Sequence, residues 1–192
     1  VQAGYREQAM RGAIRPFYAG AVVVGRARTF PSVVVYELSE DAYEKVFAAV
    51  DALWPGEVVV ASTQRSTRTC LWGVLLSTAS TARGATGAVI DGYTRDVRLI
   101  REMEFPVFAT GKYPVDSAGR SVVIDFDCPV SCGDVIVQPG DIGFGDGYGE
   151  VVLPAEVNGD VIGRGGVKVE GEHSPGVGLG VGGWLGGVLG AS

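Results

Sequence analysis

Apolar and polar positions in the first fifty residues change from a strand pattern to a helix pattern. Residues 21–29 and 33–36 are rich in valine and other strand-forming residues, which predicts two strands. A helix is predicted after Ser39, a residue type that caps helix N-termini, because apolar residues then recur every three or four positions. Pro55 and Gly56 are expected to end this helix.

The middle of the chain alternates between buried-type strands and helices. Strands are predicted at residues 57–61, 88–90 and 106–109, with helices at residues 72–83 and 96–103. Strands that alternate with helices at this spacing pair in parallel through right-handed crossovers. This part of the chain is therefore expected to form a parallel α/β layer.

The pattern changes after Ser121 to short strands separated by glycine-rich turns. The strands are predicted at residues 122–124, 135–137 and 151–153. Because no linker intervenes, we expect a single α/β domain in which a parallel part lies beside a β-rich part. The chain from Gly163 onward holds twelve glycines, which disfavour a stable helix. We therefore divide the chain into a domain over residues 1–172 and a Gly-rich C-terminal tail over residues 173–192.

Charge and composition narrow the classes of function. The 192 residues carry a net charge of −6, and the arginines are scattered singly. This argues against a nucleic-acid partner, because phosphate binding relies on clustered Lys and Arg. No run of about eighteen apolar residues is present, so we expect no membrane partner. The N-terminal residues have no apolar signal core, which favours a cytoplasmic location.

Cysteine and histidine chemistry is not expected to carry the function. Cys70, Cys128 and Cys132 do not complete a zinc set and are expected to be free thiols. The single histidine, His173, lies in the glycine-rich region. A Ser-His-Asp or Cys-His mechanism is therefore not expected.

The first candidate site follows the predicted strand at residues 57–61, since ligands of open parallel sheets bind beyond the carboxyl ends of the strands. The loop at residues 62–69 contains no acidic residue and leads into the predicted helix near Gly73. Free backbone amides and the positive dipole end at a helix start attract anions, and a glycine lets a ligand approach the backbone closely. A polar loop that merely precedes a core helix is the alternative interpretation.

The second candidate site is the adjacent pair Arg95 and Asp96, which follows the predicted strand at residues 88–90. A guanidinium can hold a carboxylate through two hydrogen bonds. An aspartate can ligate a hard cation such as Mg²⁺, and a cation that polarises a 2-oxo group stabilises a developing enolate. Taken alone, the pair could also be a helix-start acid beside a surface arginine.

The order of these motifs resembles that of the RraA-like family, which includes the 4-hydroxy-4-methyl-2-oxoglutarate aldolases. The resemblance extends from about Met10 to Glu172, and its most specific stretch is Asp91-Gly92-Tyr93-Thr94-Arg95-Asp96. The other matching stretches are residues 11–16, 25–29, 55–60, 72–79, 82–84, 105–109, 132–137 and 139–141.

The resemblance implies a fold, an assembly and a set of site residues. The fold would be a compact β/β/α sandwich, similar to swivelling phosphohistidine domains, in a homotrimer or hexamer with active sites at subunit interfaces. Arg95 and Asp96 would be the catalytic residues: Arg95 would bind the carboxylate of a small 2-oxo acid, and Asp96 would ligate Mg²⁺ or Mn²⁺. The substrate-binding residues would be Gly73, Val74, Leu75 and Leu76, together with Arg95.

The implied activity is that of a metal-dependent (class II) pyruvate aldolase or oxaloacetate decarboxylase, which cleaves a C–C bond through a pyruvate enolate. One position departs from the aldolase pattern, since Val74 stands where the family has an acidic residue. Valine cannot order a water molecule or transfer a proton. Oxaloacetate decarboxylation, which needs only the metal and the arginine, is expected to be less affected.

Two other functions remain open. Some family members are described as inhibitors that bind a ribonuclease of the RNA degradosome without known catalysis. The retained Arg95-Asp96 pair argues against this function, because a pure binding protein needs no metal ligand beside a carboxylate-binding group. The third hypothesis is an enzyme that acts on a different small acid, with Val74 marking a changed pocket.

Overall fold

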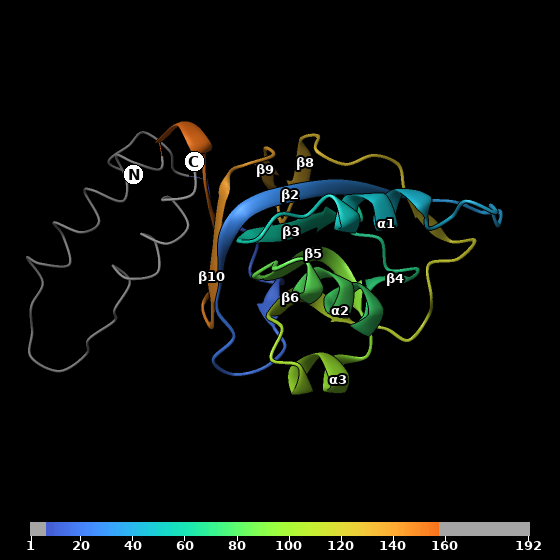
Figure 1. The fold of residues 1–192 in the computed structure, drawn as a ribbon, viewed down its shortest axis with the longest axis horizontal. Helices are drawn as coiled ribbons and strands as arrows, with labels where there is room; N and C mark the ends of the chain where they lie inside the picture. Colours follow the sequence, from blue (N-terminus) through green and yellow to red (C-terminus); the bar gives the residue numbers. More distant parts are fainter. Residues whose placement is uncertain (1–6, 158–192) are drawn as a thin grey trace, which may run out of the picture.

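Parallel pairing joins β2 to β3, β3 to β5, and β5 to β6 at the centre of the sheet (Figure 1), in a computed structural model that describes residues 7–157. The sheet order is β1-β6-β5-β3-β2-β10-β11, with β4 paired to β5 and β7 paired to β2. The four strands of this central parallel part are β2 (Val23–Val34), β3 (Glu57–Ser62), β5 (Gly87–Thr94) and β6 (Val107–Lys112). The others in this sheet are β1 (Arg15–Pro16), β4 (Cys70–Trp72), β7 (Ser121–Val123), β10 (Ile142–Asp146) and β11 (Gly149–Leu153).

Apolar cores cover both faces of this sheet, as β3 shows. Val59 and Ala61 pack into one core, and Val58 and Val60 pack into the other. A strand buried on both faces needs apolar residues at every position, which explains the continuous apolar run that the sequence shows here.

Helices cover one face and a second β layer covers the other. The helices are α1 (Glu44–Asp51), α2 (Val74–Ala82) and α3 (Val97–Glu102). Buried residues of α1 and α3 join the core of Val59 and Ala61, and the partly buried Val74 and Leu76 of α2 pack against it. The hairpin of β8 (Val130–Cys132) and β9 (Val135–Val137) supplies the opposite core. The β/β/α sandwich expected from the resemblance is confirmed.

The two strands predicted at residues 21–29 and 33–36 are one continuous strand, β2. Pro31 is the last residue of β2 that pairs with β3, and the following residues pair with β7 instead. Proline lacks the N–H that a sheet interior requires, so it is tolerated at this change of partner. The prediction of two strands was wrong because the tertiary pairing, rather than local preference, carries the strand through Pro31.

The helix predicted to begin at Trp72 begins two residues later. Cys70, Leu71 and Trp72 form β4, which pairs in parallel with the end of β5, and α2 follows after Gly73. Trp72 is buried, and its indole N–H donates to the Ser77 hydroxyl at 2.9 Å. This short strand places the start of α2 beside the carboxyl end of β5.

The C-terminal strands extend the central sheet. β10 pairs antiparallel with both β2 and β11, and a short 3-10 helix, η1 (Ala155–Val157), follows. The predicted glycine-rich tail at residues 173–192, and the predicted domain end at residue 172, lie outside the described residues. Within residues 7–157, no helix is long and apolar enough to cross a membrane.

Candidate functional site

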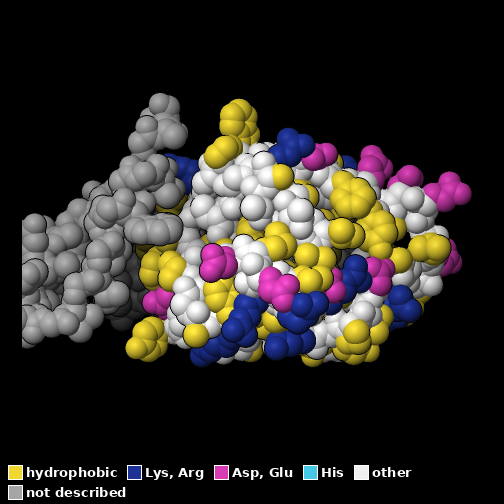
Figure 2. All heavy atoms as spheres, turned by 60° about the horizontal axis from the view of Figure 1, so that its bottom comes forward, with side chains coloured by type: hydrophobic (Ala, Val, Ile, Leu, Met, Phe, Trp, Pro, Cys, Tyr) yellow, Lys and Arg dark blue, Asp and Glu magenta, His cyan; other side chains and the backbone are white. Residues whose placement is uncertain are grey.

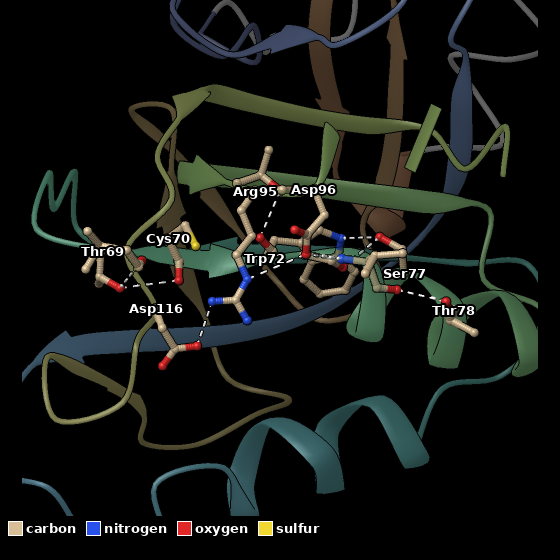
Figure 3. Close-up of polar contacts among 12 residues, drawn as sticks. Thr69, Cys70, Trp72, Ser77, Thr78, Arg95, Asp96 and Asp116 are labelled. Carbon is tan, nitrogen blue, oxygen red and sulfur yellow. Dashed lines mark hydrogen bonds and ion pairs between the residues drawn. The ribbon is translucent and has the colours of Figure 1, made fainter. Parts of the chain in front are cut away.

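The carboxyl end of β5 carries Arg95 and Asp96 into the loop before α3 (Figure 3). The Trp72 carbonyl accepts two hydrogen bonds there, from the Arg95 N–H and from the Thr94 hydroxyl, both at 3.0 Å. These bonds join the ends of β4 and β5, so that Arg95 lies beside Gly73. Asp96 has a left-handed backbone with φ of 56°, which turns the chain sharply from the strand into α3.

Gly73 is the residue against which the Arg95-Asp96 pair packs. A Cβ atom at position 73 would lie 2.9 Å from Asp96 Oδ2 and 3.1 Å from Arg95 Cγ. The backbone of Gly73 is extended, with φ of −163°, so any residue could adopt it. Glycine is therefore required for space rather than for conformation.

Asp96 caps the helix that follows Gly73. The Val74 N–H, in the first turn of α2, donates to Asp96 Oδ2 at 3.2 Å, and the cap residue Gly73 has no side chain to do so. Backbone amides in a first turn have no acceptor within the helix. The helix start that the sequence predicts as an anion site therefore already interacts with the carboxylate of Asp96, the residue before α3. Leu75 and Leu76 follow in the first turn of the same helix.

Arg95 is held on its other side by Asp116, a residue that the sequence analysis did not identify (Figure 3). Arg95 Nη1 donates to Asp116 Oδ2 at 2.6 Å, whereas Arg95 Nε lies 3.6 Å from Asp96 Oδ2. The other Asp116 oxygen accepts hydrogen bonds from the Ala118 N–H at 2.6 Å and from the Tyr43 hydroxyl at 2.7 Å. Asp116 lies in an irregular loop far from Arg95 in sequence, and no local pattern distinguishes it from a surface acid.

These contacts determine the charge of the site. Burial raises the pKa of Asp116, but the hydrogen bonds from Ala118, Arg95 and Tyr43 outweigh burial, so that the pKa lies below its usual value. The hydrogen bond that Arg95 donates to Asp116 in turn raises the pKa of Arg95. An ionised Asp116 cannot act as a proton donor, so it does not substitute for the acidic residue that the aldolase pattern has at the position of Val74. Burial raises the pKa of the neighbouring Cys70 thiol, which favours its neutral form.

Two cavities meet at Arg95. One pocket of about 300 Å³ lies between α1, α2, β4 and β7, and Gly73, Leu75, Leu76 and Arg95 line it. An open cleft of about 340 Å³ is lined by Arg95, Asp96 and Lys112. The Val74 side chain packs against the helix-side core, which leaves only its backbone N–H directed at Asp96.

The donor set around Asp96 fits a hydrated hard cation. Asp96 is 34% exposed, and its Oδ1 has no hydrogen-bond partner among the described residues. No group of three or more His, Cys, Asp or Glu side chains within residues 7–157 could surround a metal ion. Mg²⁺ suits such a site, because it commonly takes one or two carboxylates and retains several waters.

Surface charge near the helices is mixed rather than of one sign. On the face that carries α3, basic and acidic side chains lie next to one another among apolar ones (Figure 2). Arg98 and Glu102 of α3 form one such pair at 2.6 Å. The charges that distinguish the candidate site are therefore those fixed at the end of β5.

The fold and this site define the class of protein: a mixed α/β domain in which an arginine and an aspartate lie side by side at the carboxyl end of a parallel strand. Comparison with known proteins identifies the family. The chain belongs to the RraA-like family, described as Aldolase/RraA, whose sequence model matches residues 1–152.

Relatives and solved structures agree with this assignment. A Halalkalibacterium halodurans protein provisionally named 4-hydroxy-4-methyl-2-oxoglutarate aldolase is 30% identical over 141 residues, which are 73% of this chain and 64% of that protein. The structure of Streptomyces coelicolor RraAS2, described as an unusual member of the RNase ES inhibitor RraA family, has a TM-score of 0.80 and 28% identity. The match covers 89% of this chain and 85% of the RraAS2 chain.

A third match concerns a structure described as a novel cellulase from gut-associated microbes, with a TM-score of 0.85 and 30% identity. The match covers 89% of this chain and 77% of the chain in that structure. Among the curated relatives, the chain spans 23% to 64% of the length of the first three that it matches.

Proposed function

We propose that the protein is a divalent-metal-dependent lyase that cleaves a C–C bond of small 2-oxo acids through a pyruvate enolate. The activity would be of the 4-hydroxy-4-methyl-2-oxoglutarate aldolase or oxaloacetate decarboxylase type. The observation that supports this proposal is the packing of Arg95 and Asp96 against Gly73, with both side chains about one-third exposed. The family membership and the names of the relatives support it independently.

In this proposal Arg95 binds and orients the substrate carboxylate. Its guanidinium is fixed by Asp116 through Nη1, and the Arg95 side chain, which lines both cavities, remains 32% exposed. The backbone amides of Leu75 and Leu76 lie at the start of α2 and add a partial positive charge beside it. A carboxylate bound there would present its 2-oxo group to the region between Arg95 and Asp96.

Asp96 would hold Mg²⁺ or Mn²⁺ through the oxygen that the Val74 N–H leaves free. When bound, such a cation supplies Lewis-acid polarisation of the 2-oxo group, which stabilises the negative charge that develops as the C–C bond breaks. Asp96 is itself oriented by the start of α2, so its position does not depend on the cation.

The charge balance of the site explains why a cation would be required. Arg95 contributes one positive charge, and Asp96 and Asp116 contribute two negative charges within 4 Å of it. Lys112 also lines the cleft of Arg95 and Asp96 and brings this site close to neutral, so the protein alone attracts the further negative charge of a 2-oxo acid only weakly. With a divalent cation the cluster becomes net positive, so substrate binding is expected to depend on the metal.

Assembly is part of the proposal. The family resemblance supports a homotrimer or hexamer in which a neighbouring copy closes the site. Arg95, Asp96 and Asp116 remain partly exposed in the single chain, as is expected of a site that another subunit or a substrate covers.

Oxaloacetate decarboxylation tests the proposal. We expect turnover that requires Mg²⁺ or Mn²⁺, stops with a chelator, and falls to the background of the metal ion alone in Arg95→Ala and Asp96→Asn. Arg98→Ala and Glu102→Gln are matched controls, because these exposed residues of α3 pair with each other at 2.6 Å and with no other side chain within residues 7–157. Turnover that survives in either site variant would refute the proposal.

A second candidate is a non-catalytic regulator that binds a ribonuclease of the RNA degradosome. The similarity to Streptomyces coelicolor RraAS2 favours it. Purified ribonuclease that binds the wild-type protein and Arg95→Ala equally, without any lyase activity, would favour this function over the first.

A further inference from the structure

The pocket beside Arg95 is larger and more apolar than the methyl group of pyruvate requires. Its volume of about 300 Å³ lies at the lower end of small-molecule sites, which span roughly 300–1,000 Å³. Its walls come from three stretches of the chain that are distant in sequence: α1 with the residues before it, β4 with α2, and β7. The apolar wall residues include Val46, Phe47, Leu71, Leu75, Leu76 and Val123.

Charge in this pocket is confined to one end. Arg95 and Asp116 are the charged residues that line it within the described part of the chain, and they bind each other at 2.6 Å. One carboxylate can be accommodated by Arg95. A second carboxylate further along the ligand would enter apolar surroundings without a cation, which is costly.

One polar group on the pocket wall has no hydrogen-bond partner among the residues that the structure describes. Ser121 lines the pocket and is only 4% exposed, and its hydroxyl makes no hydrogen bond. Buried hydroxyls are normally paired. The Ser121 oxygen is itself covered, so this residue adds neither a charge nor an accessible polar group to the pocket.

We propose that this pocket takes the part of the substrate beyond its 2-oxo group, and that the enzyme is selective for 2-oxo acids with an apolar branched or aromatic substituent there. The inference rests on the proposed function for the role of Arg95, and it adds the substrate class. Monocarboxylic acids are then better ligands than dicarboxylic acids of the same length, so the lyase would act on a small 2-oxo acid other than 4-hydroxy-4-methyl-2-oxoglutarate. Oxaloacetate must bind before its second carboxylate departs as carbon dioxide, so it serves as a test substrate at concentrations high enough to offset its weaker binding.

Binding measurements with matched acids test the selectivity. Dissociation constants would be measured by calorimetry with Mn²⁺ present for pyruvate, 4-methyl-2-oxopentanoate, 5-methyl-2-oxohexanoate and 2-oxoglutarate. Burial of one methylene group strengthens binding by about fourfold, so 4-methyl-2-oxopentanoate should bind on the order of 10- to 60-fold more tightly than pyruvate. The last two acids differ by an isopropyl group against a carboxylate, and 2-oxoglutarate should bind at least about tenfold more weakly.

Two alanine-to-leucine substitutions test whether this pocket causes the selectivity. Ala42 lines the pocket and is half-buried, so Ala42→Leu fills it from the α1 side and should abolish the preference for 4-methyl-2-oxopentanoate over pyruvate. Ala48 lies in α1 with similar burial and does not line the pocket. Ala48→Leu should retain the preference.

The outcomes separate this inference from the proposed function. If metal-dependent turnover of oxaloacetate holds but 2-oxoglutarate binds as tightly as 5-methyl-2-oxohexanoate, the apolar selectivity is wrong and the lyase proposal stands. In a second outcome, the wild type prefers the apolar acids, Arg95→Ala and Ala42→Leu lose this preference, and no C–C bond is cleaved. The pocket assignment then stands and the lyase proposal fails. A preference retained in Ala42→Leu would overturn the pocket assignment.

Discussion

Substitution of Gly73 by alanine isolates the geometry of the site from its chemistry, because no reacting group is changed. The added Cβ would lie 2.9 Å from Asp96 Oδ2, 3.1 Å from Arg95 Cγ and 3.2 Å from Arg95 Nε. Carbon and oxygen atoms in ordinary contact lie about 3.5 Å apart. Asp96 and Arg95 must therefore retreat together, by about half an ångström.

The size of the effect follows from that displacement. A misplacement of about 1 Å in a catalytic constellation costs on the order of a hundredfold in rate, so a shift of half that size is expected to lower kcat/KM by about tenfold. The effect on folding is smaller. Alanine caps a helix less well than glycine, at a cost of about 1 kcal/mol or less, which lowers Tm by roughly 2–4 °C in a domain of this size.

The assay compares Gly73→Ala with Gly147→Ala. A Cβ at Gly147 would meet no atom within 4 Å, so this variant tests the general effect of a glycine-to-alanine change. Oxaloacetate turnover, Mn²⁺ affinity and Tm would be measured for both. If Gly73→Ala retains full turnover and Mn²⁺ affinity, the close packing of Gly73 against Arg95 and Asp96 has no functional role and the reasoning fails.

Three further variants test the neighbouring contacts. Asp116→Asn should raise KM for a 2-oxo acid several-fold with a smaller change in kcat, because Arg95 loses the ionic partner that orients it. Glu150→Gln should be more stable than the wild type at neutral pH but not below about pH 4.5, because burial, and then Asp146, raises the folded-state pKa of Glu150 well above the unfolded value. Arg11→Met should lower the free energy of unfolding by about 3 kcal/mol, because it leaves the buried Asp91 carboxylate without its cation.

Each of these predictions has a measurement that would contradict it. A lower KM of Asp116→Asn in steady-state kinetics would mean that Asp116 competes with the substrate instead of orienting Arg95. The control is Asp125→Asn, which changes an exposed acid outside the site. For Glu150, the stability contribution of the neutral acid is present below the unfolded pKa and is lost as pH rises through the folded pKa. Between the unfolded-state and folded-state pKa of Glu150, the free energy of unfolding of the wild type should therefore fall by about 1.4 kcal/mol per pH unit relative to Glu150→Gln. Urea denaturation at a series of pH values measures this difference. Parallel curves would refute this prediction, and unchanged urea midpoints in Arg11→Met would refute the prediction for Asp91.

The candidate site could be predicted from the sequence only where its parts are local. Arg95 and Asp96 are adjacent and follow a recognisable strand, and Gly73 stands at a recognisable helix start. The structure brings these residues into contact. Asp116 and Tyr43 could not be predicted, because their hydrogen bonds to the site join an irregular loop and the residue before α1 across long sequence separations.

The sequence by itself determined the parallel α/β core. A strand buried on both faces must be apolar throughout, and the run from Val58 to Ala61 records this requirement directly. The tertiary structure alone decided that β2 continues through Pro31, because the change of partner from β3 to β7 removes the need for an N–H there. It also decided that Trp72 lies in a strand, because pairing with the end of β5 satisfies a backbone that local preference would have left helical. That pairing places Gly73 against Arg95 and Asp96, so the local motif becomes a site only through a contact between distant segments.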